Sequence, residues 1–253
     1  MPDFIELQHH DGWLEITLQR PQKHNALTLR MYDDLAQVFR EANSNDAINA
    51  VVISGGETCF TSGNDLSDFM QSPPQSLDAP AFRFMDAVID LDKPLIAAVC
   101  GAAIGIGTTL LPHCDLVMAS VESQFATPFV KLGLCQEFGA SLLFGQRFGH
   151  GRAAQLILAG ERLNARTALE WGLCTHVYET PSECLAAARA QAARFGKDSL
   201  GSLLACKRLL KASLLAPLKA IVRKENQQFI TRLQTHEAQA ALRGVLEKRK
   251  SSA

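Results

Sequence analysis

Several features that mark membrane and secreted proteins are missing from this sequence. No apolar run reaches the roughly 18 residues that a membrane span needs. Residues 1–4 do not form the basic and apolar leader of a secretory signal, and residues 250–253 are not a Ser-Lys-Leu peroxisomal address. We therefore expect a soluble protein with no membrane partner.

The cysteines do not form the pattern of a disulfide framework or of a redox motif. There are seven, an odd number, no two of them make a C-x-x-C pair, and most lie inside apolar runs. Such cysteines are typical of reduced core residues. Because thiols stay reduced in the cytoplasm, we expect a cytoplasmic protein.

Signatures of nucleotide, metal and nucleic-acid binding are also absent. Gly101, Gly105 and Gly107 lack the G-x-G-x-x-G spacing of dinucleotide sites, and no G-x-x-x-x-G-K-[ST] loop occurs. His9 and His10 flank a turn and do not indicate a metal site. Aromatic residues do not alternate with the basic ones, as they do on many nucleic-acid-binding surfaces. We expect no NAD, no ATP, no metal and no nucleic acid.

Size and charge suggest how the chain is divided. A length of 253 residues with 47% hydrophobic residues suits one compact domain, or a core with a smaller appendage. The net charge is −1, but residues 196–253 contain 12 Lys or Arg and 4 Asp or Glu, hence +8, which leaves −9 for residues 1–195. A basic region can meet phosphate, be a solvated helix surface or contact an acidic neighbouring subunit. Gly196 favours a break after the helix at residues 181–195, between residues 1–195 and residues 196–253.

Periodic apolar residues predict alternating strands and helices. Residues 13–19 alternate like a strand and should pair with residues 4–8, and Thr28 can cap a helix. Continuous apolar runs predict buried parallel strands at residues 50–54, Leu95–Val99 and 116–119, with a short strand at His176–Tyr178. Helical spacing predicts helices at residues 81–91, after Gly139, from Arg152, from Asn164, and at residues 181–195, 200–210, 215–222 and 223–246.

The chain is organised around residues 93–115, where the strand Leu95–Val99 leads into a glycine turn and an apolar helix. The turn contains almost no polar side chains, so only its backbone can do chemistry. Gly105 and Gly107 flank Ile106, so the main chain there can approach a ligand closely, and N–H groups at a helix N-terminus suit an anion. Taken alone, the pattern is equally typical of tight strand-to-helix packing.

A strand-to-helix corner of the same kind lies earlier in the chain, after the strand at residues 50–54. It reads Cys-Phe-Thr-Ser-Gly-Asn-Asp-Leu over residues 59–66. Two strand-glycine-helix corners can each direct one N–H group at the same oxygen atom, and this is how an oxyanion hole is built. Together with residues 20–27, Arg-Pro-Gln-Lys-His-Asn-Ala-Leu, these segments resemble the crotonase (enoyl-CoA hydratase/isomerase) superfamily. The resemblance covers nearly the whole chain, from Phe4 to the C-terminal helices.

The resemblance implies an α/β fold: a crotonase-like spiral core of repeated ββα units with a C-terminal helical region. Residues 1–195 would form the catalytic core that binds acyl-CoA, and residues 196–253 would pack on neighbouring subunits in a homotrimer or a dimer of trimers. The substrate is an acyl-CoA, so coenzyme A is part of the substrate and no separate cofactor is expected. The backbone N–H groups of Asn64 and Ile106 would be the oxyanion donors, while Lys23 would meet a phosphate or remain an ordinary surface lysine. The implied substrate-binding residues are Lys23, His24, Ala26, Ser62, Gly63, Asn64, Asp65, Leu66, Gly105, Ile106, Pro128 and Phe129.

The catalytic acids of the family's hydratases are missing. Those enzymes use two glutamates, and aligning the motifs puts these positions at Thr109 and Phe129, whose side chains have no pKa near neutrality. One acid, Glu137, remains in the apolar run that follows. Partial desolvation would raise its pKa toward neutrality, which suits a base that must return its proton. The alternative is a solvent-exposed loop acid.

The same pattern resembles the monofunctional Δ3,Δ2-enoyl-CoA isomerases of the peroxisomal type. The shared features are the Ser-Gly-Asn-Asp-Leu corner, the Gly-Ile-x-x-Thr-Leu-Leu helix start and a lone glutamate, although their usual Pro-Glu-Gly is Gln136-Glu137-Phe138 here. The resemblance implies an isomerase with Glu137 as its catalytic base. The alternatives are an enoyl-CoA hydratase or another crotonase-family enzyme, and a catalytically silent acyl-CoA-binding oligomer.

Overall fold

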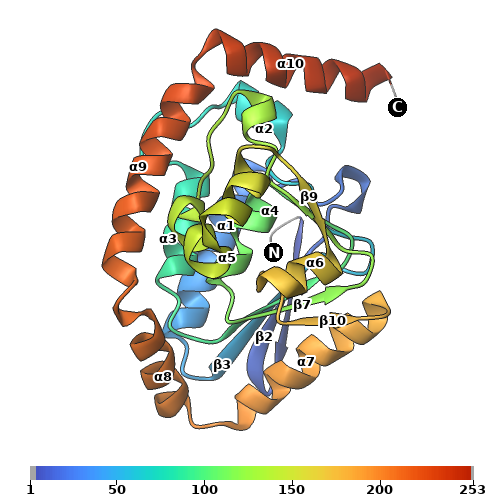
Figure 1. Cartoon of the computed structure of the whole chain (residues 1–253). Helices are drawn as coiled ribbons and strands as arrows, with labels where there is room; N and C mark the ends of the chain where they lie inside the picture. Colours follow the sequence, from blue (N-terminus) through green and yellow to red (C-terminus); the bar gives the residue numbers. More distant parts are fainter. Residues whose placement is uncertain (1–3, 252–253) are drawn as a thin grey trace.

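The computed structural model describes residues 4–251 of the chain, and within them the strands form two sheets (Figure 1). The larger sheet has the strand order β1-β2-β3-β5-β7-β10, and the smaller has the order β4-β6-β8-β9. The larger sheet comprises β1 (Ile5–His10), β2 (Gly12–Leu18), β3 (Ile48–Ser54), β5 (Leu95–Val99), β7 (Leu116–Ser120) and β10 (His176–Tyr178). The smaller comprises β4 (Cys59–Thr61), β6 (Ala102–Ile104), β8 (Gln124–Ala126) and β9 (Arg162–Asn164).

Successive strands pass from the larger sheet to the smaller one and back. β3 leads to β4, β5 to β6 and β7 to β8, and each pair is followed by a helical segment. β3, β5 and β7 are parallel neighbours in the larger sheet, as are β4, β6 and β8 in the smaller one. These are the repeated ββα units that the sequence predicts, and the buried strands lie at the predicted positions.

The helices of the core follow from their capping residues and apolar spacing. Thr28 caps the first helix as predicted, because its Oγ1 accepts a hydrogen bond from the N–H of Met31 at 3.2 Å. Gly149, with φ of 79° and ψ of 161°, kinks the fifth helix, which explains why the sequence shows separate patterns after Gly139 and from Arg152. The helices are α1 (Leu29–Ser44), α2 (Leu66–Gln71), α3 (Pro80–Ile89), α4 (Ile106–Thr109), α5 (Ala140–Ile157), α6 (Ala165–Trp171) and α7 (Pro181–Lys197), with single turns η1 (Pro21–Lys23), η2 (Leu111–His113) and η3 (Val130–Leu132).

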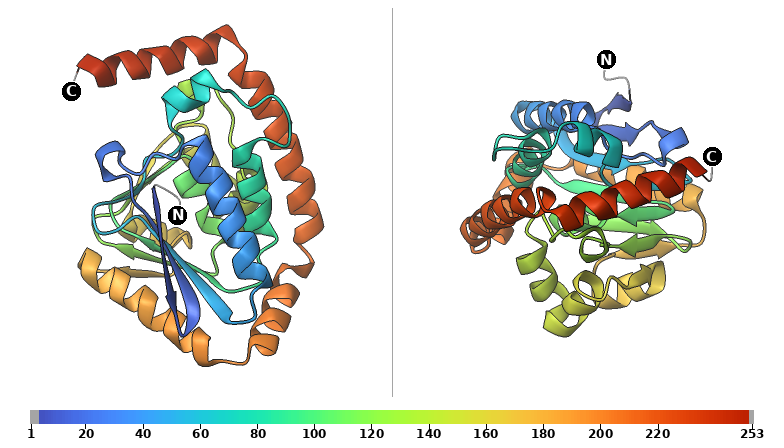
Figure 2. Two further views of the ribbon diagram at one scale, coloured as in Figure 1. Left: turned by 180° about the vertical axis from the view of Figure 1, so that it is seen from behind. Right: turned by 90° about the horizontal axis from the view of Figure 1, so that it is seen from above.

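The strand β3 is buried on both of its faces. Because side chains alternate along a strand, Val51 and Ile53 join the main core with α1 and α3, whereas Ala50 and Val52 join a second cluster that α7 covers. Figure 2 shows α1, in blue, and α7, in orange, on different sides of the larger sheet. Burial on both faces is what the continuous apolar runs in the sequence predict.

The C-terminal region forms the helices α8 (Leu200–Ala212), α9 (Leu215–Leu233) and α10 (His236–Ser251). In Figure 1, α9 runs along the side of the core and α10 crosses its top. The predicted break between residues 222 and 223 is wrong, because α9 continues without interruption and buries Val222 and Phe229 on the core. The chain turns at Thr235 instead, whose Oγ1 accepts a hydrogen bond from the N–H of Ala238 at 3.3 Å.

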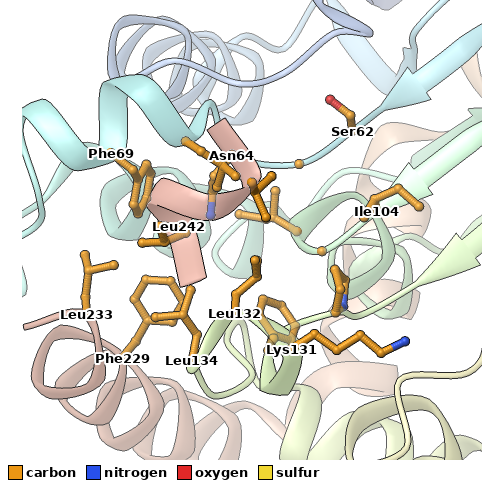
Figure 3. Close-up of a pocket in the computed structure, with 17 residues that line it drawn as sticks. Ser62, Asn64, Phe69, Ile104, Lys131, Leu132, Leu134, Phe229, Leu233 and Leu242 are labelled. Carbon is orange, nitrogen blue, oxygen red and sulfur yellow. The ribbon is translucent and has the colours of Figure 1, made fainter. Parts of the chain in front are cut away.

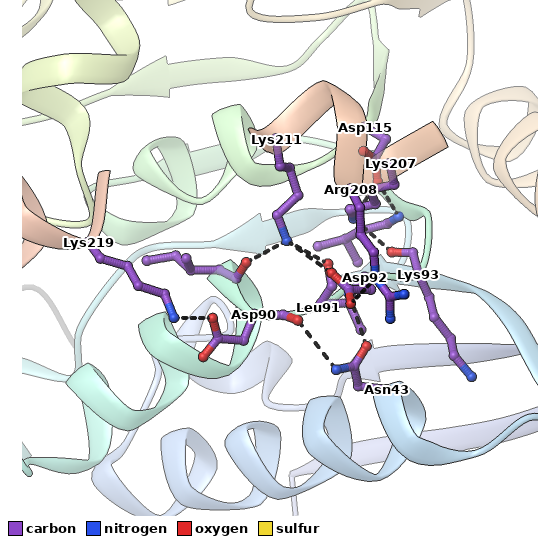
Figure 4. Close-up of polar contacts among 12 residues, drawn as sticks. Asn43, Asp90, Leu91, Asp92, Lys93, Asp115, Lys207, Arg208, Lys211 and Lys219 are labelled. Atoms are coloured by element: carbon purple, nitrogen blue, oxygen red, sulfur yellow. Dashed lines mark hydrogen bonds and ion pairs between the residues drawn. The ribbon is translucent and has the colours of Figure 1, made fainter. Parts of the chain in front are cut away.

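Basic residues of α8 bind to the core of the same chain (Figure 4). Lys207 Nζ lies 2.7 Å from the Asp115 carboxylate and donates a 2.7 Å hydrogen bond to the carbonyl oxygen of Lys93. Lys211 Nζ donates to the carbonyl oxygen of Ile89 at 2.6 Å. Part of the positive charge of the C-terminal region therefore pairs with polar groups of the core.

Within the described residues, no helix is long and apolar enough to cross a bilayer. No group of three or more His, Cys, Asp or Glu side chains in this part of the chain could hold a metal ion. The cysteines are free thiols and most are buried, in agreement with their predicted place in the core, while Cys135 is half-buried and Cys206 is exposed.

Candidate active site

The first corner is the turn between β4 and α2. Asp65 caps α2, because its Oδ1 accepts hydrogen bonds from the N–H groups of Ser67 at 3.0 Å and Asp68 at 3.2 Å. Its other oxygen, Oδ2, lies 2.6 Å from Nη1 of Arg20. The Asp65 carboxylate is therefore occupied in holding the corner.

The segment at residues 23–27 lies directly against this corner. The N–H of Ser62 donates to the carbonyl oxygen of His24 at 2.9 Å, and the N–H of Leu27 donates to that of Gly63 at 2.8 Å. Two of the segments that the sequence singles out are thus neighbours in space.

The second corner is the turn between β6 and α4. Gly105 has φ of 58°, and Ile106 is the first residue of α4. The two corners touch, since a Cβ atom added to Gly63, which has φ of 91°, would lie 2.8 Å from the carbonyl oxygen of Ile104. A side chain at this position would push the corners apart, so the close approach requires glycine.

Each corner leaves one backbone donor without a partner. The N–H groups of Asn64 and Ile106 take part in none of the hydrogen bonds among the described residues. For Ile106 this follows from its place, because the first N–H groups of a helix have no partner within the helix. Both residues border the same pocket. Two unpaired donors beside one cavity are what an oxyanion hole requires.

The pocket between the corners has a volume of about 300 Å³ and is mainly apolar. In Figure 3 the side chains of Phe69, Phe229 and Leu233 gather at one end, and Ser62 lies toward the other. Lys131 is the one charged side chain among the described residues of its lining. Such a cavity suits an alkyl chain that carries its polar group at the corners. The lining residues are Ser62, Gly63, Asn64, Leu66, Phe69, Ile104, Gly105, Ile106, Pro128, Phe129, Lys131, Leu132, Leu134, Phe229, Leu233, Leu242 and Val245.

The two positions at which hydratases would carry glutamates contribute no acid. Thr109 is buried in α4, where its hydroxyl donates to the carbonyl oxygen of Ile106 at 3.5 Å. Phe129 is a buried wall of the pocket. Among the described residues of the lining there is no carboxylate, so the pocket wall itself offers no acid of the kind that the hydratases use.

Glu137 lies in the turn between η3 and α5 and is 1% exposed. Its Oε1 has no hydrogen-bond partner among the described residues. Burial, and to a smaller extent the neighbouring charge of Glu225 on α9, raises the pKa of the Glu137 carboxyl to about 8. The alternative of an exposed loop acid is wrong. Glu137 does not belong to the lining of the pocket in this structure.

Tyr32 of α1 links the first corner to Glu137. Its hydroxyl donates a hydrogen bond to Oδ1 of Asn64, and the ring is fully buried. Burial and the charge of Glu137 raise the pKa of this hydroxyl, so it stays protonated and remains a donor. The Tyr32 hydroxyl therefore fixes the side chain of Asn64 and leaves the backbone N–H of that residue free.

The structure brings most of the sequence-predicted site residues to one pocket. It is lined by Ser62, Gly63, Asn64, Leu66, Gly105, Ile106, Pro128 and Phe129 from that set. The remaining five, Lys23, His24, Ala26, Asp65 and Glu137, are not in the lining. The sequence did not point to Tyr32, to Glu225 or to the C-terminal wall formed by Phe229, Leu233, Leu242 and Val245. For Tyr32 and the wall, the available signal was apolar helical spacing, which predicts burial and not a role in a site.

Comparison with known proteins places this geometry in a family. The family model described as Enoyl-CoA hydratase/isomerase matches residues 8–252. The chain belongs to the enoyl-CoA hydratase/isomerase family. The members of this crotonase family bind acyl-CoA substrates.

The individual relatives of this chain include proteins named as isomerases and proteins named as hydratases. Enoyl-CoA delta isomerase 2 of Rattus norvegicus is 37% identical over 173 residues, which are 66% of this chain and 44% of that protein, so the chain spans less than half of it. A probable enoyl-CoA hydratase of Rhizobium meliloti is 30% identical over 242 residues, covering 93% and 92% of the two chains. The structure of Pseudomonas aeruginosa OdaA is similar with a TM-score of 0.94 at 41% identity, over 96% of this chain and 98% of that one. The crotonase fold with C-terminal helices is thereby confirmed.

Proposed function

We propose that this family member is a Δ3,Δ2-enoyl-CoA isomerase, in which Glu137 alone moves the proton. One observation carries the proposal: the buried carboxyl group of Glu137 has a pKa of about 8 and an unpaired oxygen, and its charge acts on Tyr32, which bonds to Asn64 of the first corner. Thr109 and Phe129 occupy the positions of the hydratase acids. A single base with this pKa can both accept and return a proton near neutral pH.

The reaction would proceed in two proton transfers. The Glu137 carboxylate takes a proton from C2 of a 3-enoyl-CoA, and the electron pair moves onto the thioester oxygen, which gives a dienolate. The resulting carboxylic acid returns the same proton to C4, and the double bond ends between C2 and C3. The N–H groups of Asn64 and Ile106 would bind the dienolate oxygen. Without such stabilisation the α-carbon of a thioester is too weak an acid for a carboxylate.

The substrate would lie across the two corners. The acyl chain enters the apolar pocket toward Phe69 and Phe229, which meet edge to face with their ring centroids 6.3 Å apart. The coenzyme A portion would follow the surface made by residues 23–26 and 62–66, where Lys23 and His24 are exposed. Coenzyme A is then part of the substrate.

Substrate binding must also open a path to the base, because Glu137 does not line the pocket in this structure. Leu132 and Leu134 line it, and they immediately precede the turn that carries Glu137. A small displacement of residues 132–137 on binding would bring the carboxyl group to the reacting carbons. Catalytic distances commonly shorten only when the substrate is bound.

An assay with two substrates tests the proposal against its alternatives. Purified protein is given 3-hexenoyl-CoA and, separately, 2-hexenoyl-CoA, and ultraviolet absorbance follows the conjugated thioester. We expect 3-enoyl-CoA to be isomerised much faster than 2-enoyl-CoA is hydrated. Comparable rates would assign the protein to the hydratases, and binding without turnover of either substrate would make it a silent acyl-CoA-binding protein.

A further inference from the structure

Glu225 of α9 is a second buried carboxylate next to the turn that carries Glu137. It is 5% exposed. Its Oε2 accepts a hydrogen bond from the N–H of Gly139 at 2.6 Å, and its Oε1 accepts one from the N–H of Ser141 at 2.9 Å and another from the Ser141 hydroxyl. These backbone groups start α5 and have no partners within the helix. A residue far away in the sequence thus holds the end of the Glu137 turn.

The turn itself has a backbone that needs such support. Phe138 has φ of 61°, a left-handed conformation that costs free energy for a residue other than glycine, and Gly139 follows with φ of 75°. On the other side, Nε2 of His113 is 2.7 Å from the carbonyl oxygen of Phe138, and the two rings stack with centroids 4.0 Å apart. His113 therefore fixes Phe138, which directly follows Glu137, and Glu225 fixes Gly139, the next residue.

The titratable groups around Glu137 come from four parts of the chain. Tyr32 faces it from α1, Glu225 from α9 and Cys135 from its own turn, and His113 of η2 contacts the adjacent Phe138. Burial raises the pKa values of the Tyr32 hydroxyl and the Cys135 thiol, the latter to about 11, and lowers that of His113 to about 3. All three are therefore uncharged near neutral pH. Hydrogen bonds from Gly139 and Ser141 favour the ionised form of Glu225, although burial raises the pKa of this carboxyl.

We infer that Glu225 is a positioning residue, which holds the Glu137 turn in place from α9 and adds a second carboxyl group to the buried surroundings of the base. The inference rests on the proposed function, since it assumes that Glu137 is the base. It adds a role for the C-terminal helix α9: the base comes from the core, and the group that tunes it comes from the helical region.

The test is the Glu225→Gln variant, which keeps the size of the side chain but removes its charge. We expect kcat to fall roughly 10-fold to 100-fold with little change in KM, because a misplaced base slows the chemical step. We also expect the pH dependence of kcat/KM to shift to lower pH, since the like charge that raises the pKa of Glu137 is gone. Glu225→Asp keeps the charge but shortens the reach, so its rate should fall while its pH dependence stays near that of the wild type.

Glu15→Gln is the matched control. Glu15 is also buried and is paired with Arg189, 2.9 Å away, outside the proposed site. This variant should lose stability but keep the wild-type pH dependence of isomerisation. Circular dichroism identifies variants that do not fold.

A direct titration separates this inference from the proposed function. In wild-type protein labelled with ¹³C at the glutamate carboxyls, the Glu137 resonance, assigned with Glu137→Gln, should show a second inflection where Glu225 titrates. This readout needs neither turnover nor a folded Glu225 variant. A Glu137 titration without that inflection, or one that is unchanged in folded Glu225→Gln, overturns the role of Glu225. Full activity of Glu137→Gln would instead overturn the proposed function.

Discussion

At the scale of single residues, the proposed site combines one base with two backbone donors. Glu137 supplies the carboxyl group, and burial sets its proton affinity. Asn64 and Ile106 supply their backbone N–H groups, and their side chains have other roles. The Asn64 side chain accepts a hydrogen bond from Tyr32, and Ile106 lines the pocket. The arrangement separates the group that moves the proton from the groups that stabilise charge.

The pKa of Glu137 predicts the pH dependence of the reaction. The base must be ionised to take a proton, and its folded-state pKa of about 8 lies above the ordinary value for a glutamate. We therefore expect kcat/KM for a 3-enoyl-CoA to rise with pH through about 8 and then to level off. Initial rates between pH 6 and 10, about two units on either side of that pKa, measure the profile. A rate that is already maximal at pH 6 would mean that another group, or an ordinary carboxylate, is the base.

Replacing Ile106 tests the backbone donor of the second corner. Ile106 is the first residue of α4, a position where proline fits a helix and where only the N–H group is lost. Ile106→Pro should lose about 3 to 4 kcal/mol of transition-state stabilisation, the usual cost of one oxyanion donor. Ile106→Ala keeps the N–H and serves as the control for the lost side chain. Equal rates in the two folded variants would rule out an oxyanion contact at this residue.

The sequence predicted the corners but not the side chains that support them. Glycine spacing and the apolar strands before it are local signals, so Gly63, Gly105 and their neighbours could be read directly. Tyr32 and Glu225 reach the site through the packing of α1 and α9, and their sequence surroundings resemble those of any amphipathic helix. A contact between residues so far apart in the chain depends on the finished fold.

At the scale of secondary-structure elements, the buried strands were the easiest to predict and the C-terminal helix ends the hardest. The strands β3, β5 and β7 are short apolar runs, which few other structures can accommodate. The turn between α9 and α10 contains neither glycine nor proline, and it is set by the cap at Thr235 and by where α9 meets the core.

The attachment of α8 to the core depends on an ion pair between the buried Lys207 and the more exposed Asp115. The side chain of Lys207 is 7% exposed and binds both the Asp115 carboxylate and the carbonyl oxygen of Lys93. Lys207→Ala should lower the free energy of unfolding by about 2 kcal/mol, because it leaves the buried carbonyl oxygen of Lys93 without this partner and removes the ion pair. Arg208→Ala removes an ion pair to Asp92 from a side chain that is 61% exposed, and it should cost at most about 1 kcal/mol. Urea unfolding measures the free energy of unfolding of both variants. Similar losses of this free energy would show that the Lys207 contacts do not anchor α8.

At the scale of the whole molecule, the pocket is lined by residues from both sides of the proposed division between residues 195 and 196. The corners of the core line one part of it. The C-terminal helices line another part with Phe229, Leu233, Leu242 and Val245. The expected role of residues 196–253 in oligomer contacts is therefore joined by a role in forming the site. Deleting this region should remove the pocket wall as well as any subunit contact.

The predicted assembly is a homotrimer or a dimer of trimers. Leu209 and Leu210 of α8 are 76% and 81% exposed, which is unusual for adjacent leucines and fits a surface that a neighbouring subunit covers. Light scattering should give three or six times the chain mass of 27.5 kDa, and Leu209→Ser with Leu210→Ser should reduce it. A stable wild-type monomer would contradict the prediction.

The most direct measurement of the central claim is the isomerase rate of Glu137→Gln. The amide has nearly the size of the carboxyl group but cannot take a proton, so the rate on 3-hexenoyl-CoA at pH 8 should fall roughly 100-fold to 10,000-fold while the affinity for coenzyme A changes little. Circular dichroism and oligomer size provide the control for folding. A missing base should leave about one hundredth of the wild-type rate or less. If a folded Glu137→Gln protein keeps more than about a third of that rate, Glu137 is not the catalytic base.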